Sequence, residues 1–226
     1  MSWSFMASRG RAKDEEPMVN ARRLERGHRW FAFCYSRFIA RAEQRQWGEA
    51  RRRVFDGLQG RVLEVGVGSG TNLSYYPPGV QVVATEPDQH MLKRARKRIE
   101  ELHATNVELR QAAAETLPFE DASFDHVLCT WVLCTVDDLV RTLAEVRRVL
   151  HSEGTFRFME HVRNDRNTFW RGMQNVIAPV WHWMGAGCRL NQGTERLIES
   201  AGFRFDWIER VPGWLQPVIY GVARPV

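Results

Sequence analysis

Apolar residues follow two different patterns along the part of this chain that comes after residue 60. Short, nearly continuous apolar runs are typical of buried strands, whereas apolar residues that recur every three or four positions mark one face of a helix. The runs predict strands at residues 61–65, 80–86, 107–110, 124–130, 155–162, 205–209 and 218–223. The periodic segments predict helices at residues 88–103, 137–150 and 193–201, with Asp88 as an N-cap and a turn at residues 151–154.

The order of these elements predicts the fold. Strands that alternate with helices are joined by right-handed crossovers and form a parallel sheet with helices on both faces. The connection at residues 211–217 is too short to contain a crossover helix, so the last two strands should form an antiparallel hairpin. We therefore predict an α/β fold, with a doubly wound, Rossmann-like sheet of seven strands that ends in an antiparallel hairpin.

Positive charge is concentrated at the N-terminus. Residues 1–60 contain 13 Lys and Arg against 7 Asp and Glu, while the whole chain has a net charge of only +5. Arginines alternate with aromatic and apolar residues between His28 and Phe55, a pattern that suits an amphipathic helix. The helix could pack on the domain, lie on a membrane surface or contact nucleic acid, but no other motif supports nucleic acid. We divide the chain into a basic extension with a helical cap, residues 1–58, and a main domain, residues 59–226.

Length and composition exclude several classes of protein. With 226 residues, 44% of them hydrophobic, the chain suffices for one α/β domain with an extension. No apolar run reaches the roughly 18–20 residues that span a bilayer, and the N-terminus does not resemble a secretory signal. The cysteines lack metal-site spacing, so no metal is expected, and they are Cys34, Cys129, Cys134 and Cys188. We predict a cytoplasmic protein, with peripheral membrane contact through the basic helix as the alternative.

Three glycines at alternate positions follow the first predicted strand. Gly66, Gly68 and Gly70 allow the backbone to approach a ligand closely, and Glu86 ends the second predicted strand. This layout is typical of a site for an adenosine-containing ligand, whose ribose hydroxyls pair with the acid. A dinucleotide loop has the spacing G-x-G-x-x-G, but Thr71 stands where its third glycine would be. The spacing therefore argues against NAD.

The glycine motif resembles motif I of the class I S-adenosylmethionine (SAM) methyltransferases, and residues 61–162 follow the order of motifs in that family. The resemblance implies SAM as the cofactor and S-adenosylhomocysteine as its product. The residues that it places at the cofactor are Glu64, Gly66, Gly68, Gly70, Asn72, Glu86, Pro87, Met91, Ala114, Glu115 and Thr130. Many relatives have an aspartate where this chain has Ala113, so the adenine contact would fall to Glu115 or to the backbone. Asn72 could instead cap a helix, and Met91 could be a core residue.

The acceptor should lie where the fourth and fifth predicted strands end, because ligands of a doubly wound sheet bind outside the carboxyl ends of its strands. Trp131 could face the positive sulfur of SAM there or serve only in packing. Glu160 and His161 end the fifth strand, and His161 could act as a general base, oriented by Glu160, or hold a lid by hydrogen bonds. Cys134 and Trp181 are further candidates for binding the substrate. We expect no covalent intermediate on Cys134.

Residues 164–191 form a tryptophan-rich insertion between the fifth strand and the last helix. Its apolar residues suit one side of a helix, and they are Trp170, Met173, Ile177, Trp181, Trp183 and Met184. Pro179 would bend this helix or mark its start. This apolar pattern indicates either a lid over an apolar pocket or a segment that packs only on the sheet.

A closer resemblance is carried by short motifs in the second half of the chain. They are similar to those of the small thiol S-methyltransferases, the methyltransferase-like seven group, and comprise residues 129–134, 158–162, 179–182, 187–190 and 217–221. The resemblance implies methylation of a small, lipophilic acceptor such as a thiol, or else of a quinone or a phospholipid head group. Those relatives begin with an apolar anchor, whereas this chain has a polar stretch at residues 9–16. Outside this class, a non-catalytic SAM-binding protein and an NAD-dependent oxidoreductase remain alternatives.

Overall fold

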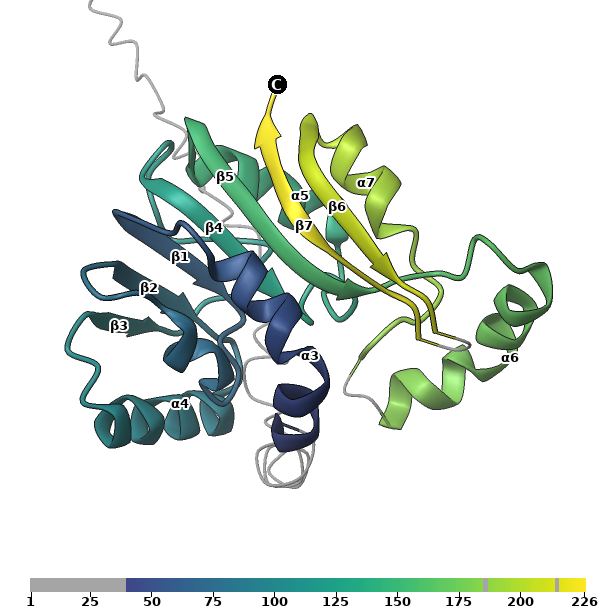
Figure 1. The fold of residues 1–226 in the computed structure, drawn as a ribbon, viewed down its shortest axis with the longest axis horizontal. Helices are drawn as coiled ribbons and strands as arrows, with labels where there is room; N and C mark the ends of the chain where they lie inside the picture. The colour runs from purple at the N-terminus through teal and green to yellow at the C-terminus, as the bar shows by residue number, and fades with distance from the viewer. Residues whose placement is uncertain (1–39, 185–186, 214–215) are drawn as a thin grey trace, which may run out of the picture.

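Seven strands form one mixed sheet in the computed structural model, which describes residues 40–184, 187–213 and 216–226 (Figure 1). The strands stand in the order β3-β2-β1-β4-β5-β7-β6. Their bounds are Arg61–Val65 (β1), Gln81–Thr85 (β2), Val107–Arg110 (β3), Phe124–Thr130 (β4), Leu150–His161 (β5), Phe203–Val211 (β6) and Val218–Pro225 (β7). Strands β1 to β5 are parallel to one another, whereas β7 is antiparallel to both β5 and β6. The predicted Rossmann-like sheet with a C-terminal hairpin is confirmed.

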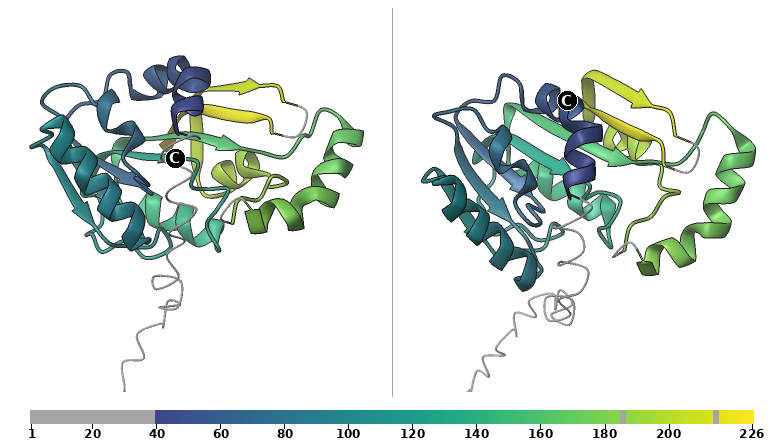
Figure 2. Two further views of the ribbon diagram at one scale, coloured as in Figure 1. Left: turned by 90° about the horizontal axis from the view of Figure 1, so that it is seen from below. Right: turned by 60° about the horizontal axis from the view of Figure 1, so that its bottom comes forward.

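Helices cover both faces of this sheet, with α3 and α5 on opposite sides (Figure 2, left). The helices are α3 (Ala40–Phe55), α4 (Gln89–Leu102), α5 (Leu139–Val149), α6 (Thr168–Met184) and α7 (Thr194–Ser200). Asp88 caps α4, as predicted, by accepting hydrogen bonds from the backbone N–H groups of His90 and Met91. Asp138, one residue later than expected, caps α5 in the same way.

The hydrophobic core lies in two layers because successive strand residues point to opposite faces of the sheet. Leu63 belongs to the layer under α5 and α7, while its neighbour Val62 belongs to the layer under α3 and α4. Both side chains are fully buried. This near-continuous burial is what the uninterrupted apolar runs predicted for parallel strands.

The predicted turn at residues 151–154 is wrong, because β5 begins at Leu150 directly after α5. Leu150 is buried and pairs with Phe124, whereas the next pair is His126 with Thr155, so β5 has extra residues at an irregularity in its pairing with β4. Gly154 lies at this irregularity, where a Cβ atom would come within 2.8 Å of the carbonyl oxygen of Asp125. The glycine therefore serves close packing of two strands and not a chain reversal.

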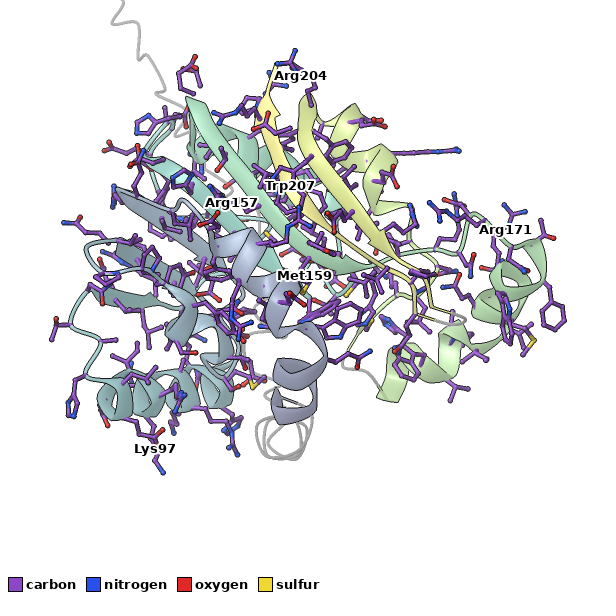
Figure 3. All side chains as sticks on the ribbon, viewed as in Figure 1. Lys97, Arg157, Met159, Arg171, Arg204 and Trp207 are labelled. Carbon is purple, nitrogen blue, oxygen red and sulfur yellow. The ribbon has the colours of Figure 1, made fainter. Side chains whose placement is uncertain are left out.

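The described part of the N-terminal helix, α3, packs on the sheet. Val54 and Phe55 are buried, and Arg157 of β5 donates a 2.8 Å hydrogen bond to the carbonyl oxygen of Val54 at the end of α3 (Figure 3). Of the arginines in this segment, Arg51 is buried and Arg53 pairs with Glu209. The rest of the predicted amphipathic helix, including Cys34, lies outside the described residues, so membrane contact and the boundary at residue 58 stay predictions. None of the described helices is long and apolar enough to cross a bilayer.

Candidate functional site: a cofactor loop beside a cysteine–histidine cluster

The glycine loop leaves the end of β1 in a conformation that side chains rarely adopt. Gly66, Gly68 and Gly70 all have positive φ, at 71°, 56° and 83°. At Gly66 a Cβ atom would also lie 2.4 Å from a methyl group of Val132, so this position has no room for any side chain. The N–H group of Val67 donates to the carbonyl oxygen of Thr85, which fixes the loop against β2. The glycines thus form a tight loop directly after β1, where the sequence predicted a ligand-binding loop.

Glu86 lies directly after β2, next to this loop. Its carboxylate accepts hydrogen bonds of 3.0 Å from the backbone N–H groups of Gly68 and Asp88. Burial raises the pKa of Glu86 to about 7, against the lowering effect of these two hydrogen bonds, and the nearby carboxylates of Asp88 and Glu64 add to the increase. The structure thus places the predicted ribose-binding acid at the rim of the glycine loop.

A buried polar network lies behind the loop. Asn72 donates through Nδ2 to Glu64 and to Thr130, both at 2.7 Å, and its Oδ1 accepts from Arg51. The other oxygen of Glu64 accepts from the hydroxyl of Tyr76, and burial raises the pKa of Glu64. Asn72 therefore neither caps a helix nor leaves its amide free, because its hydrogen bonds join β1, β4 and α3.

Sequence reasoning missed Arg51 because it stands in a run of three arginines that was interpreted as a polar helix face. The signal that could have found it is its helical spacing. Arg51 lies one turn before Val54 and Phe55, which are buried apolar residues of α3. A charged residue on the apolar side of a helix indicates a buried partner.

Each of the remaining predicted cofactor residues has a different contact within the domain. Met91 is buried, and its methyl group would lie 3.7 Å from a Cβ atom at Gly68. The carbonyl oxygen of Pro87 accepts from Gln111. Ala114 is part of the hydrophobic core, and Glu115 accepts a 2.9 Å hydrogen bond from the N–H group of Asp137. Contacts of these four residues with the cofactor stay predictions.

Trp131 follows β4 in a strained conformation, with φ at 59°. Glu160, which is fully buried on β5, stabilises this turn by accepting hydrogen bonds from the N–H groups of Val132, Leu133 and Cys134. Burial raises the pKa of Glu160 to about 7, while these three donors act in the opposite direction. Both carboxylate oxygens are occupied by the backbone, so Glu160 positions the turn after β4, whereas the sequence suggested that it orients the ring of His161.

We therefore expect Glu160→Ala to lower the free energy of unfolding by about 2 kcal/mol, because it leaves buried N–H groups without an acceptor. Denaturant unfolding followed by circular dichroism measures this loss. Glu153→Ala is the matched control, since Glu153 is an exposed acid on the same strand. Equal stability of the two variants would show that the turn does not depend on Glu160.

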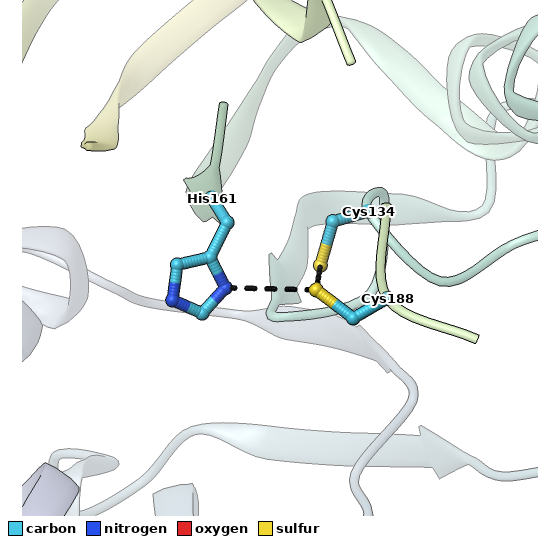
Figure 4. Close-up of side chains that lie close together, drawn as sticks. All are labelled: Cys134, His161 and Cys188. Carbon is cyan, nitrogen blue, oxygen red and sulfur yellow. Dashed lines mark hydrogen bonds between the residues drawn. The ribbon is translucent and has the colours of Figure 1, made fainter. Parts of the chain in front are cut away.

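Three of the predicted acceptor-side residues meet at the carboxyl ends of β4 and β5. The rings of Trp131 and His161 are stacked with their centres 4.3 Å apart. Cys134 lies beside Cys188, with 3.6 Å between the two sulfur atoms, and Cys188 lies 4.0 Å from Nδ1 of His161 (Figure 4). Trp181 of α6 packs against both cysteines. Cys188 had no role in the sequence prediction, although it belongs to one of the quoted motifs.

The pKa values of the two thiols in this cluster are shifted in opposite directions. The hydrogen bond with Cys134, followed in importance by His161, lowers the pKa of Cys188 to about 5, although burial acts against this shift. The pKa of Cys134 is raised well above its ordinary value by the same hydrogen bond and by burial. Among the described residues, the buried indole N–H group of Trp131 has no hydrogen-bond partner.

Helix α6 forms most of the predicted insertion and extends beyond the ends of the strands (Figures 1 and 2). It begins at Thr168 and continues through Pro179, so the prediction that it starts at the proline is wrong. The buried Gln174 joins α6 to the body of the domain by donating to the carbonyl oxygens of Val162 and Leu190. The predicted apolar side is partly buried at Trp170, Met173, Ile177 and Trp181. The side chains of Trp183 and Met184 lie outside the description.

Comparisons with known proteins agree with this geometry. A family model described as a methyltransferase domain matches residues 63–158. Thiol S-methyltransferase TMT1A of Homo sapiens is 35% identical over 210 residues, which cover 86% of each chain. This chain belongs to the SAM-dependent methyltransferases. Human thiol S-methyltransferase TMT1B is 33% identical and covers 86% of this chain and 88% of its own. The crystal structure of the YcgJ protein from a Bacillus species has the same fold, with a TM-score of 0.66 at 17% identity, over 80% of this chain and 98% of its own.

Membership in this family settles the cofactor. The methyltransferase uses SAM and releases S-adenosylhomocysteine. The glycine loop, Glu86 and the buried network around Asn72 fit such a molecule because they combine a close backbone approach with an acid for ribose hydroxyls. The alternatives of an NAD-dependent oxidoreductase and of a non-catalytic binding protein are excluded.

Proposed function

We propose that this methyltransferase transfers the methyl group of SAM to the sulfur atom of a small, lipophilic thiol. Two human relatives that match 86% of the chain are named thiol S-methyltransferases, which supports this acceptor. The proposal concerns the acceptor alone, because methyl transfer from SAM follows from the family.

The observation that carries this proposal is the chemical character of the groups beside Trp131. Two sulfur atoms, one imidazole and the indoles of Trp131 and Trp181 meet there, and Leu190 adds an apolar side chain. An ammonium acceptor would need a nearby carboxylate, but Glu160 is already occupied by three backbone donors. Soft, weakly polar surroundings suit an alkyl thiol better than a head group that carries several hydrogen-bonding groups.

The reaction is an in-line displacement at the methyl carbon, which SAM activates through its sulfonium group. The acceptor reacts as its thiolate, so the thiol must first lose a proton. The sulfur–methyl bond of SAM breaks as the new sulfur–carbon bond forms, and the products are a methyl thioether and neutral S-adenosylhomocysteine. The face of Trp131 is suited to stabilise the positive sulfonium by a cation–π contact.

A panel of acceptors tests this proposal. We expect radiolabel from SAM to appear in alkyl thiols and not in the alcohols of identical carbon chain, which serve as matched controls. Quinols and amino-lipid head groups are included because they represent the two competing acceptor classes. Labelling of a quinol or an amino lipid in preference to every thiol would overturn the proposal.

We further propose that the enzyme acts in the cytoplasm, with peripheral contact to anionic membranes through its basic N-terminal residues. Arg51 and Arg53 of α3 already have partners within the domain. Membrane contact therefore rests on residues 1–39, where most of the remaining excess of arginine lies.

A further inference from the structure

Cys134, His161 and Cys188 come from three distant segments and present their ligand atoms to one another. Cys134 belongs to the turn after β4, His161 ends β5, and Cys188 lies between α6 and α7. One ligand atom from each residue lies within 4.8 Å of the other two (Figure 4). Two cysteine sulfurs and one imidazole nitrogen are a ligand set that zinc prefers.

Two of the three distances are close to those of a tetrahedral zinc site, and the third pair, Cys134 and His161, has ligand atoms within 4.8 Å of each other. With bonds of about 2.3 Å to sulfur and 2.0 Å to nitrogen, two sulfurs are about 3.8 Å apart, and a sulfur and a nitrogen are about 3.6 Å apart. The cluster has 3.6 Å between its sulfurs and 4.0 Å between Cys188 Sγ and His161 Nδ1. Small side-chain movements would complete the geometry.

We propose that Cys134, Cys188 and His161 bind a zinc ion through their two sulfur atoms and Nδ1. The backbone holds the two cysteines in place, because the N–H group of Arg189 donates a 2.7 Å hydrogen bond to the carbonyl oxygen of Cys134. Glu160 in turn fixes the N–H group of Cys134. Because these hydrogen bonds hold the ligands in place before the metal binds, the chain loses little conformational entropy on binding.

Three protein ligands leave the fourth position of a tetrahedral zinc ion open, as in catalytic zinc sites. On the basis of the proposed thiol methylation, this position would take the sulfur of the acceptor. The metal favours the thiolate, so the thiol's proton leaves to solvent on binding, and His161 acts as a ligand in place of the base that the sequence predicted. After methyl transfer the thioether carries no negative charge and binds the metal less strongly, which favours release of the product.

The short distance between the sulfurs also allows a competing outcome, a disulfide between Cys134 and Cys188. Its formation removes two electrons and two protons and needs an external oxidant such as a peroxide. A disulfide makes no use of the imidazole nitrogen that lies 4.0 Å from Cys188, whereas a metal ion uses all three groups. The arrangement therefore favours the metal, and the experiment must distinguish the two.

The test measures metal content and does not depend on methyl transfer. The full chain is purified under reducing conditions, equilibrated with zinc, dialysed and analysed by mass spectrometry for bound metal. We expect one zinc per chain in the wild type and almost none in Cys188→Ser. Cys129→Ala is the matched control and should keep its zinc, because Cys129 is a buried free cysteine of β4 outside the cluster. Cobalt in place of zinc should give a thiolate charge-transfer band that Cys134→Ser weakens.

A second variant addresses the possibility that Cys188→Ser fails to fold. His161→Cys retains three metal-binding side chains, so we expect it to keep the zinc that His161→Ala loses. Metal-free wild type, zinc content unchanged in Cys188→Ser, or an intact mass two hydrogens lighter in reducing buffer would each overturn the proposal. Stoichiometric zinc without methylation of any thiol would leave the metal site standing and refute the proposed acceptor.

Discussion

Turnover of a thiol acceptor should fall by roughly 10²- to 10⁴-fold when His161 is replaced by alanine, the usual contribution of a group that controls the acceptor's proton. Affinity for SAM should remain near that of the wild type. The imidazole contacts Trp131 and Cys188, whereas the glycine loop and Glu86 lie at the ends of β1 and β2. Steady-state rates and calorimetric SAM binding on one preparation measure both quantities.

The acidity of the acceptor gives this prediction a sharper test. Whether His161 takes the proton itself or binds the metal that displaces it, its role is to supply the thiolate. The loss in His161→Ala should therefore be smaller for a thiol that is already ionised at the assay pH than for one that is not. His151→Ala is the matched control, because His151 is an exposed histidine at the other end of β5. An equal loss for both acceptors would contradict a role in ionisation, and a lost SAM site would place His161 with the cofactor.

The cofactor side of the site could be predicted from the sequence because its signals are local. The loop from Gly66 to Gly70 spans five consecutive residues, and each of its glycines has a positive φ, a conformation that side chains rarely adopt. The predicted bounds of β1 match those of the structure, Arg61–Val65. The apolar run stops at a glycine and begins after a charged residue, which limits where the strand can lie. Glu86 follows from the same logic, because the ends of parallel strands meet at one edge of the sheet.

The acceptor side could be predicted only in part because its contacts join distant segments. Cys134 and Cys188 are separated by 54 residues, far from any metal-binding spacing, and meet only because α6 returns its chain to the turn after β4. Glu160 and His161 are neighbours in sequence, yet one supports a backbone turn and the other faces the cluster, as alternation along a strand requires. The sequence predicted that Glu160 orients His161 because it shows that the two residues are adjacent, but not that their side chains point in opposite directions.

Removal of the Glu86 carboxylate should weaken SAM binding by about 2–3 kcal/mol, which is roughly a 30- to 150-fold rise in Kd, the range expected when charge-assisted hydrogen bonds are lost. The fold should survive in Glu86→Ala, because the residue lies after the end of β2. The substitution removes hydrogen bonds to two loop N–H groups and leaves the pairing of the strands unchanged. Calorimetric titration with SAM measures the effect, and Glu108→Ala, a change in an exposed acid of β3, is the control. An unchanged Kd would show that other groups hold the ribose.

The pKa of Glu86 is raised to about 7, so two properties should depend on pH in opposite directions. These are the free energy of unfolding and the affinity for SAM. Between pH 4.5 and 7 the folded chain holds a proton on Glu86 that the unfolded chain has lost, so this group lowers the free energy of unfolding as the pH rises. SAM requires the ionised acid, so its affinity should rise about tenfold from pH 6 to pH 8. Glu64 and Asp88 are the acids that face Glu86, and both remain in Glu86→Gln. If that variant kept the full pH dependence of SAM binding, the titrating group would be another one.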